Sequence, residues 1–428
     1  MRYQPLPAKF HTANRQKLAE LIPEHAFAIV DTADVLRRAG DFEYPFRPDS
    51  NFYYLTGIDE SEAVLVITPH HPNQRLREVL FLRETSEFTA LWEGQRLTQD
   101  QATKRSGIQT VLWLSELESF LEQLVGKYST VYLNAESSLE SGPLNPASRR
   151  AIKLHAQLPT HDIISSVAIM GDMRTVKAPE EVDQIRRAID ITGRGLAKAW
   201  AALKPDVPEY ALEAELTAEF TRQGATGSAF SAIIAGGQNA TVIHYSTDAA
   251  EIGADDLVLF DVGAEAGYYA ADISRTVPAS GRFSDRQRAV YEAVHKAQAA
   301  GIALHKPGAT IISIDAAMRT VLIKELVSLG LITSEQAAGP DAQKHLSQYY
   351  SHISQHLGLD VHDTGSPVEE LKTGMVVTCE PGLYLAEEGI GVRLEDDILI
   401  TDTGCEVLSK SIPSTPDDVE AAIAGHRQ

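Results

Sequence analysis

The chain has 428 residues and a formal net charge of −21, with 43% hydrophobic and 23% charged residues. A chain of this length exceeds one compact core, so we expect two domains. The negative charge argues against nucleic acid or an anionic membrane as the main partner. We expect no signal peptide and no membrane span, because no run approaches the roughly 20 apolar residues that a span needs. The only cysteines are Cys379 and Cys405, which predicts no disulfide framework and a cytoplasmic location.

The first part of the chain alternates short apolar runs with helical patterns. Residues 114–128 have the spacing of an amphipathic helix. Strands are predicted at HAFAIV (25–30), AVLVITP (63–69), EVLFL (78–82) and TVYLN (130–134). This alternation predicts an α/β domain with a parallel or mixed sheet.

A change of pattern marks the domain boundary, which we place between residues 165 and 178. Pro179 and the two glutamates after it favour the first turn of a new helix. We therefore expect an N-terminal domain over residues 1–170 and a C-terminal domain over residues 171–428.

The second part of the chain begins with helices and continues with strands. A helix is predicted over residues 210–224, with Gly224 as its C-terminal cap, and further helices lie between residues 284 and 336. Strands are predicted at residues 231–237, 257–263, 268–277, 375–385 and 392–401. Strands grouped beside separate helices predict an α+β domain.

Four acidic residues stand in or beside apolar strands of the second domain. Asp261 follows four apolar residues, and Asp272 lies eleven residues later, after a glycine-bounded turn. An antiparallel pairing would bring these two side chains onto one face. Glu380 and Glu395 also stand among apolar residues.

Buried carboxylates at short distance cannot all stay ionised without a cation. A structural ion pair would explain one such acid, but four in one domain favour a divalent metal ion or a pair of them. Two bridged ions would hold a hydroxide at neutral pH and polarise a carbonyl, which is hydrolase chemistry. The sequence contains no phosphate-binding loop, no Gly-x-Ser-x-Gly elbow and no His-Glu-x-x-His helix.

Several motifs, taken in order, resemble the aminopeptidase P (Xaa-Pro aminopeptidase) branch of the pita-bread metallopeptidases. RPDSNFYYLTG and LWEGQRL lie in the first domain, and LGLDVHD, CEPGLY and GVRLEDD lie in the second. The resemblance covers nearly the whole chain. It implies a C-terminal pita-bread catalytic domain that hydrolyses the N-terminal Xaa-Pro bond with a metal-bridging hydroxide. It also implies a peptide substrate with proline in second position and a homo-oligomer, either a dimer or a tetramer.

The same resemblance assigns the metal ligands. They fall on Asp261, Asp272, Glu380 and Glu395, together with one histidine. Asp272 and Glu395 would bridge two divalent ions, most often manganese, with cobalt, iron or zinc as alternatives. Glu380 would also receive or pass the proton of the attacking hydroxide.

Further residues match the substrate site of the family. His244 and His362 correspond to histidines that contact the substrate and the developing oxyanion. Arg393 corresponds to an arginine that holds nearby acids in place, and Tyr384 to a tyrosine that lines the site. Trp92 resembles a tryptophan that approaches an active site, often that of a neighbouring subunit, although a packed core position is an equal alternative.

The expected ligand histidine is missing from its usual position. In the family it precedes the last histidine of LGLDVHD by seven positions, and seven positions before His362 is Gln355. His356 is one position nearer, and adjacent side chains of a strand point to opposite faces. Without a gap, Gln355 takes the metal-ligand position. If one residue is deleted and a bulge absorbs the change, His356 is the ligand, and His352 keeps the four-residue spacing that relatives often show.

Three functions therefore remain open. The first is an Xaa-Pro aminopeptidase, and the second is a proline dipeptidase that acts on Xaa-Pro with the same ligands. The third is a weakly active or inactive pita-bread binding protein, which Gln355 favours. The four acids argue against the third, because buried carboxylates without a role are costly.

Overall fold

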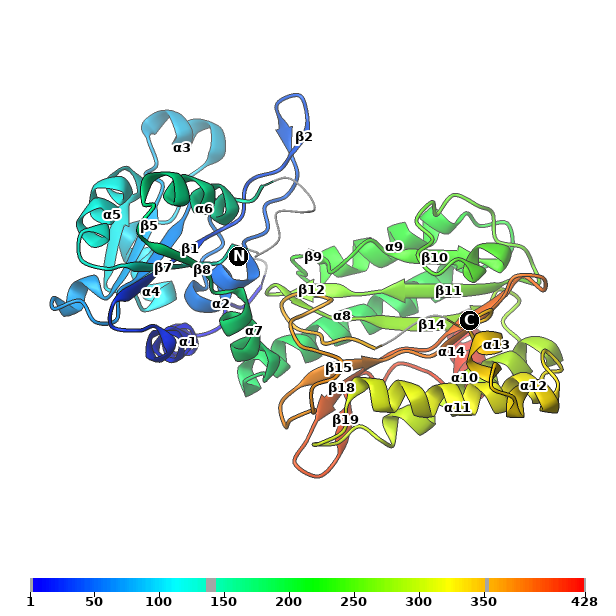
Figure 1. Ribbon diagram of the computed structural model, residues 1–428. Coiled ribbons are helices and arrows are strands. Elements are labelled where there is room, and N and C mark those ends of the chain that lie inside the picture. The colour runs from blue at the N-terminus through cyan, green and yellow to red at the C-terminus, as the bar shows by residue number, and fades with distance from the viewer. Residues whose placement is uncertain (1–2, 136–143, 351–353, 427–428) are drawn as a thin grey trace. The chain divides into compact units, whose positions relative to one another are not determined.

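The structure is a computed structural model that describes residues 3–135, 144–350 and 354–426 (Figure 1). The chain divides into two compact units, residues 5–173 and residues 1–4 with 174–428. No helix in these described ranges combines the length and apolar character that crossing a bilayer requires.

The N-terminal unit is built on a mixed sheet of six strands in the order β6-β5-β4-β1-β7-β8. Its strands are β1 (Ala26–Asp31), β4 (Val64–Ile67), β5 (Glu78–Leu82), β6 (Thr110–Trp113), β7 (Thr130–Leu133) and β8 (Asp162–Ser165). β1 pairs parallel with β7 and antiparallel with β4. Every residue of β1 is buried, as expected of a central strand that is covered on both faces.

Helices and one separate hairpin complete this unit, and the α/β prediction is confirmed. The helices are α1 (Ala8–Leu21), α2 (Ser50–Thr56), α3 (Glu87–Glu93), α4 (Gln99–Ser106), α5 (Leu117–Val125), α6 (Pro146–Gln157) and α7 (Val167–Thr175). The hairpin consists of β2 (Arg37–Ala39) and β3 (Phe42–Glu43). β6, β8, the hairpin and most of these helices are absent from the sequence-based prediction.

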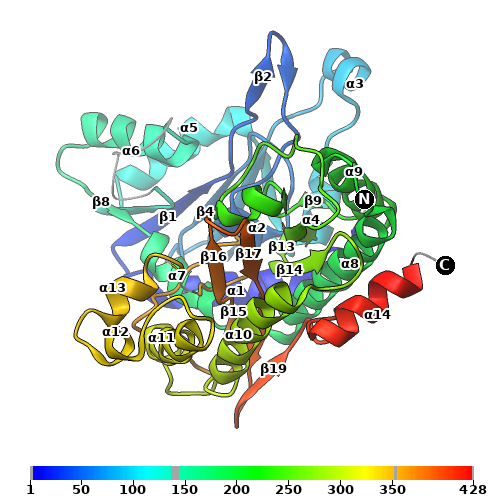
Figure 2. The same ribbon diagram turned by 90° about the vertical axis from the view of Figure 1, so that its right-hand side faces the viewer.

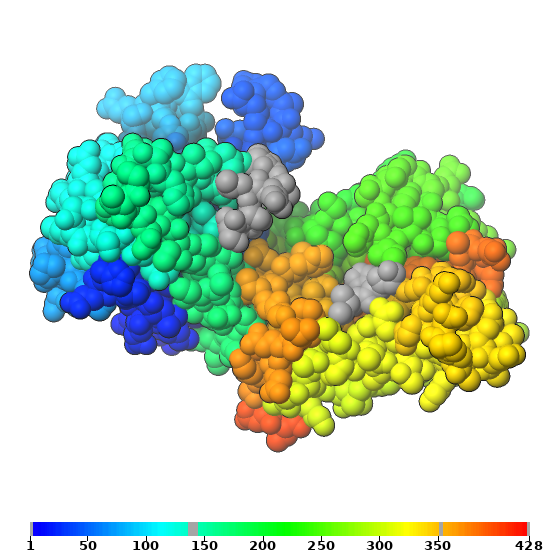
Figure 3. Space-filling model, in the orientation of Figure 1, coloured from blue at the N-terminus to red at the C-terminus, as the bar shows by residue number. Residues whose placement is uncertain are grey.

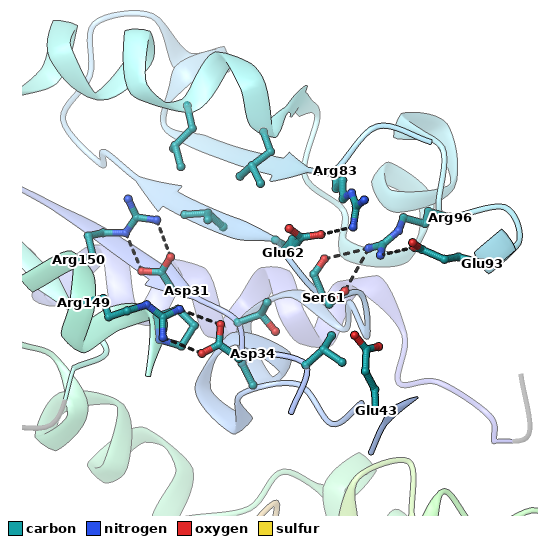
Figure 4. A pocket seen from close by; sticks show the side chains of 18 of the residues that line it. Asp31, Asp34, Glu43, Ser61, Glu62, Arg83, Glu93, Arg96, Arg149 and Arg150 are labelled. Atoms are coloured by element: carbon teal, nitrogen blue, oxygen red, sulfur yellow. Dashed lines mark hydrogen bonds and ion pairs between the residues drawn. The ribbon is translucent and has the colours of Figure 1, made fainter. Parts of the chain in front are cut away.

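Ion pairs line a cavity of about 620 Å³ at the carboxyl end of β1 (Figure 4). Arg150 donates two hydrogen bonds to Asp31, at 2.6 and 2.7 Å, and Arg149 donates two to Asp34, both at 2.8 Å. Bidentate pairs of this kind orient both partners. They therefore join the end of β1 to α6, and the arginine charges are balanced within the cavity wall.

In the C-terminal unit, helices cover strands on two sides (Figures 1 and 2). The helices are α8 (Pro179–Ala202), α9 (Glu209–Arg222), α10 (Asp285–Ile302), α11 (Ile311–Ser328), α12 (Ser334–Ala338), α13 (Ala342–Leu346) and α14 (Pro416–His426). The predicted start of α8 at Pro179 is confirmed. α8 and α9 pack against each other on one side of the strands, and α10 and α11 pack against each other on the other side.

The strands of this unit form several small antiparallel sheets, so the α+β prediction is confirmed. They are β9 (Gly227–Ser228), β10 (Ile233–Gly236), β11 (Leu257–Val262), β12 (Ala264–Ala266), β13 (Tyr269–Ala270), β14 (Ile273–Pro278), β15 (Val376–Cys379), β16 (Gly382–Leu385), β17 (Ile390–Arg393), β18 (Asp396–Ile400) and β19 (Cys405–Val407). β10, β11 and β14 form one sheet, and β15, β18 and β19 form another.

Three predicted strands are each divided in the structure, and the one over residues 268–277 forms β13 and β14. The sequence predicts one strand over residues 375–385, but β15 ends before Glu380 and β16 begins after Pro381. Likewise, β17 and β18 are separated by Leu394 and Glu395. β15 pairs with β18 and β16 pairs with β17, which form the hairpin seen in Figure 2. The breaks after β15 and β17 let the chain pass from one sheet to another, and a glutamate stands at each of these two crossings.

Candidate metal centre and active site

Three carboxylates meet where these strands come together. Asp261, Asp272 and Glu395 each place one carboxylate oxygen within 4.8 Å of the others. Asp261 lies on β11 opposite Ser274 of β14, and Asp272 directly precedes β14. The connection is not a simple turn, because the short β12–β13 hairpin lies between these strands. The predicted convergence of Asp261 and Asp272 on one face nevertheless occurs.

The carboxylates line a cavity of about 270 Å³. Other predicted site residues also line it, namely Glu380, Gln355, His244 and His362. Sequence reasoning did not identify several further lining residues, among them Phe230, Ser231, Tyr245 and Val361. They precede β10 or lie in loops, where no periodic pattern indicates which side chains face a cavity.

Several carboxylates lie close together in this cavity, so a cation bound there would be electrostatically favourable. Burial raises the pKa of Asp272 well above its ordinary value, and the nearby carboxylates of Asp261 and Glu380 raise it further. Burial, followed by the charge of Asp272, also raises the pKa of Glu395. Within the described residues, Asp261 Oδ1 and Glu395 Oε1 are buried and accept no hydrogen bond.

These observations fit a divalent cation. Buried oxygen atoms without donors, close to two further carboxylates, are the ligands that hard and borderline ions prefer. A bound ion would remove the mutual repulsion that otherwise favours protonation of these acids.

Arg393 and Tyr384 support the cluster from behind the cavity wall. The Arg393 guanidinium pairs with Asp261 and donates hydrogen bonds to Ser274 Oγ and the Tyr384 hydroxyl, each at 2.8 Å. Neither residue is among those that line the cavity. Arg393 thus orients Asp261 and balances one carboxylate charge, while Tyr384 fixes the guanidinium.

Thr378 is a supporting residue that sequence reasoning missed. Its hydroxyl donates a 2.6 Å hydrogen bond to Glu380 Oε1 and accepts one of 3.1 Å from the backbone N–H of Gln355. A residue two positions from a strand ligand shares its face. That spacing is the signal by which Thr378 could have been found.

The same spacing applies to two further residues. The Ser274 hydroxyl donates to Glu395 Oε2 at 2.8 Å, and Asp397 Oδ2 accepts from the backbone N–H of Asp272 at 3.2 Å. Ser274 lies two positions after Asp272, and Asp397 lies two positions after Glu395. Both residues fix the orientation of the cluster.

Gln355 and His356 have different surroundings. Gln355 lines the cavity and donates a 3.0 Å hydrogen bond from Nε2 to Asp272 Oδ2. His356 makes an isolated bridge to Val377 and is not among the residues that line this cavity. Its ring packs against Gly365, where a Cβ atom would lie only 2.3 Å from it. His352 lies outside the described residues.

The two histidines predicted to contact the substrate come from separate loops. His244 lies between a short 3₁₀ helix, η3 (Gly237–Thr241), and β11, and His362 lies in the segment before β15. Both line the 270 Å³ cavity and a neighbouring cavity of about 540 Å³. Their loops therefore border the carboxylate cluster.

Trp92 belongs to the N-terminal unit. It lies on α3, a helix without buried residues, and is 73% exposed. This exposure rules out the packed core position that the sequence left open. The role of Trp92 in substrate binding stays a prediction.

Comparison with known proteins identifies the family. The profile of metallopeptidase family M24 matches residues 183–402, and that of the aminopeptidase P N-terminal domain matches residues 11–132. The chain belongs to family M24. Its relatives include the Xaa-Pro aminopeptidases of Escherichia coli, 34% identical with 97% of each chain covered, and of Haemophilus influenzae, 32% identical with 96% of each covered.

Solved structures of related proteins resemble this fold over nearly the whole chain. Aminopeptidase PepP of Pseudomonas aeruginosa is 33% identical, with a TM-score of 0.90 and 99% of each chain covered. Aminopeptidase P of E. coli, solved with the inhibitor Pro-Leu, is 32% identical, with a TM-score of 0.88 and coverage of 99% of this chain and 100% of that one. The predicted aminopeptidase P branch and its two-domain pita-bread fold are confirmed. As a member of this metallopeptidase family, the protein uses divalent metal ions.

Proposed function

We propose that this M24 member releases the N-terminal residue from peptides that carry proline in second position. It is a metal-dependent Xaa-Pro aminopeptidase, as its full-length relatives are. The observation that carries the assignment is the group of Asp261, Asp272 and Glu395 within 4.8 Å of one another, in a cavity large enough for part of a peptide. E. coli aminopeptidase P has been solved with a substrate and with Pro-Leu.

The proposed cofactor is a pair of divalent ions, manganese first and cobalt, iron or zinc as alternatives. The residues that would hold these ions are Asp261, Asp272, Glu380, Glu395 and Gln355. His356 would replace Gln355 as a ligand if this chain lacks one residue relative to the family. The unpaired oxygens of Asp261 and Glu395 support this assignment. When bound, such ions polarise a carbonyl oxygen and make water a nucleophile at neutral pH.

The protein's own residues would supply orientation and proton transfer. His244 and His362, on the rim of the cavity, would donate hydrogen bonds to the substrate and its developing oxyanion. Glu380 would take the proton of the attacking water and pass it to the proline nitrogen that leaves. Arg393 would hold Asp261 in one orientation throughout.

One experiment separates the three candidate functions. The metal-loaded protein is incubated with a tripeptide Xaa-Pro-Xaa and, separately, with the dipeptide Xaa-Pro. We expect release of the first residue from the tripeptide alone. Cleavage of the dipeptide alone would show a proline dipeptidase, and no cleavage of either by protein with bound metal would show a binding protein.

We also propose a homo-oligomer, a dimer or a tetramer. The β2–β3 hairpin and α3 project from the N-terminal unit, as Figure 3 shows in blue and light blue. They expose large apolar side chains, including Phe42, Phe88, Leu91 and Trp92. Apolar projections of this kind mark contact surfaces.

Cys379 and Cys405 are both free thiols, which supports our proposal of a reducing, cytoplasmic location.

A further inference from the structure

We infer that Glu209 is a positioning residue that holds the loop bearing His244 and acts on the reaction through that histidine. The inference rests on the function proposed above. Glu209 is the first residue of α9, and it is fully buried, with 0% of its surface exposed. Sequence patterns give it no role, because it lies outside every motif of the family resemblance.

The Glu209 carboxylate accepts four hydrogen bonds. Oε1 accepts from the backbone N–H of Gly236 at 2.8 Å and from Asn239 Nδ2 at 3.0 Å. Oε2 accepts from the Tyr245 hydroxyl at 2.9 Å and from the backbone N–H of Ala250 at 3.0 Å. Two donors on each oxygen fix both the position and the rotation of the carboxylate.

These donors lie on both sides of His244 along the chain. One oxygen binds residues 236 and 239, where β10 leads into η3, and the other binds residues 245 and 250, where the chain returns toward β11. A further hydrogen bond of 3.0 Å joins Asn239 Nδ2 to the Tyr245 hydroxyl. The Glu209 carboxylate therefore binds this loop at both of its ends.

His244 needs this support because it is exposed. Its side chain lines the cavity but lies in a loop whose neighbours, such as Val242 at 53% exposure, also face solvent. An exposed loop has many backbone conformations of similar free energy. Catalysis requires a donor held close to one geometry, and a misplacement of about 1 Å can cost about 100-fold in rate.

The chemistry of the clamp requires a carboxylate. Among the described residues, the hydrogen-bond donors of Glu209 are neutral, and its place in the first turn of α9 adds the favourable field of the helix N-terminus. Glutamine in its place would turn an N–H₂ group toward donors that now face an oxygen. At least one of the two ends of the loop would be released.

A double-mutant cycle tests the inference. We would measure kcat and KM for Xaa-Pro-Xaa cleavage with saturating metal in the wild type, Glu209→Gln, His244→Ala and the double variant. Exposed Glu215 lies on the same helix, and Glu215→Gln is the matched control with wild-type kinetics. We expect Glu209→Gln to lower kcat by roughly 10- to 100-fold, with metal stoichiometry unchanged by calorimetry. The double variant should match His244→Ala, since the clamp acts through that side chain.

Other results overturn the inference. Unchanged kcat in Glu209→Gln, full activity in His244→Ala, or rate losses that multiply in the double variant would each show that Glu209 does not act through His244. An inactive wild type would refute the proposed function together with the inference, whereas an active wild type with multiplying losses would refute the inference alone.

A milder variant covers the case in which Glu209→Gln does not fold. Tyr245→Phe removes one donor and leaves the carboxylate in place. It should lower kcat in the wild-type background and leave the His244→Ala background unchanged. An equal loss in both backgrounds would overturn the inference.

Discussion

Gln355 donates a hydrogen bond to Asp272, with 3.0 Å between Nε2 and Oδ2. The amide thus presents a donor to the carboxylate cluster, where an imidazole would present a lone pair to a metal ion. An amide oxygen can coordinate a hard cation, but it is a weaker ligand than imidazole for manganese, cobalt or zinc. One metal position should therefore bind its ion more weakly than it would with histidine at this place.

Gln355→His should raise the affinity of the weaker metal position by roughly tenfold or more, in line with the effect of single groups around metal sites. The reason is that the new imidazole would offer a ligand atom from a side chain that already lines the cavity. Calorimetric titration of metal-free protein with Mn²⁺ measures the change. Unchanged or weakened binding would speak against the alignment without a gap.

His356→Ala should leave metal affinity unchanged. The His356 ring packs against Gly365, and His356 is absent from the lining of the 270 Å³ cavity. Calorimetric titration of the metal-free variant with Mn²⁺ measures this affinity. Loss of metal in this variant would make His356 the ligand and support the alignment with one deleted residue.

Asp363→Asn should lower the free energy of unfolding by about 3–5 kcal/mol. The Asp363 side chain is 1% exposed and pairs with two buried cations, Arg174 and Lys177. The amide would remove the carboxylate partner of buried Lys177 and one of the two carboxylate partners of buried Arg174, which also pairs with Asp360. Urea denaturation measures the loss. Asp190→Asn, at an exposed pair with Arg194, is the control and should change stability by at most about 1 kcal/mol. Equal effects of the two changes would contradict this account.

Ionisation of Glu181 should lower the free energy of unfolding of the C-terminal unit as pH rises. Burial raises the pKa of Glu181 from 4.5 to about 7. Between these values the folded state holds a proton that the unfolded state has lost, so stability falls as pH increases through this window. Glu181→Gln does not titrate, and its stability relative to the wild type should rise by about 3 kcal/mol from pH 4.5 to pH 7.5. Urea denaturation of metal-free protein across this range measures the difference. A difference that is constant with pH would disprove the shift.

Leu91→Glu should reduce assembly. Leu91 is 82% exposed on α3, and a charge there would oppose burial of the apolar projections in a contact between subunits. Light scattering after size-exclusion chromatography measures the mass. Ile152→Glu places the same charge on α6, at a half-exposed apolar residue that belongs to neither the hairpin nor α3, and should leave the mass unchanged. An assembly that survives Leu91→Glu would exclude α3 from the contact.

The buried acids of the site could be predicted from sequence, because an acid beside an apolar run is unusual. Asp261 and Glu395 both stand out in this way. The pair Pro381-Gly382 signals a break in the strand predicted over residues 375–385, which the prediction missed, whereas no such signal marks the break after Arg393. At neither place does the sequence show that the chain changes sheets. The sequence therefore indicates that Glu380 and Glu395 are unusual acids, but it does not show that each stands where the chain passes from one sheet to another.

The first helix shows a different limit. α1 buries His11, Asn14 and Arg15 beside Phe10 and Leu18, so polar side chains interrupt the apolar stripe of its inner face. Arg15 is fully buried because it donates to Glu78 and to the backbone carbonyls of Leu55 and Ser106. These partners are distant in sequence. Only the tertiary structure can show that such a helix is buried.

The metal content of protein purified without chelator tests the central claim most directly. Elemental analysis should find two divalent ions per chain, and Asp272→Ala should lose metal together with activity, because Asp272 lies within the group of three carboxylates. Wild-type protein that is folded, contains no divalent ion and takes none up on titration would contradict a metal-dependent function for this site.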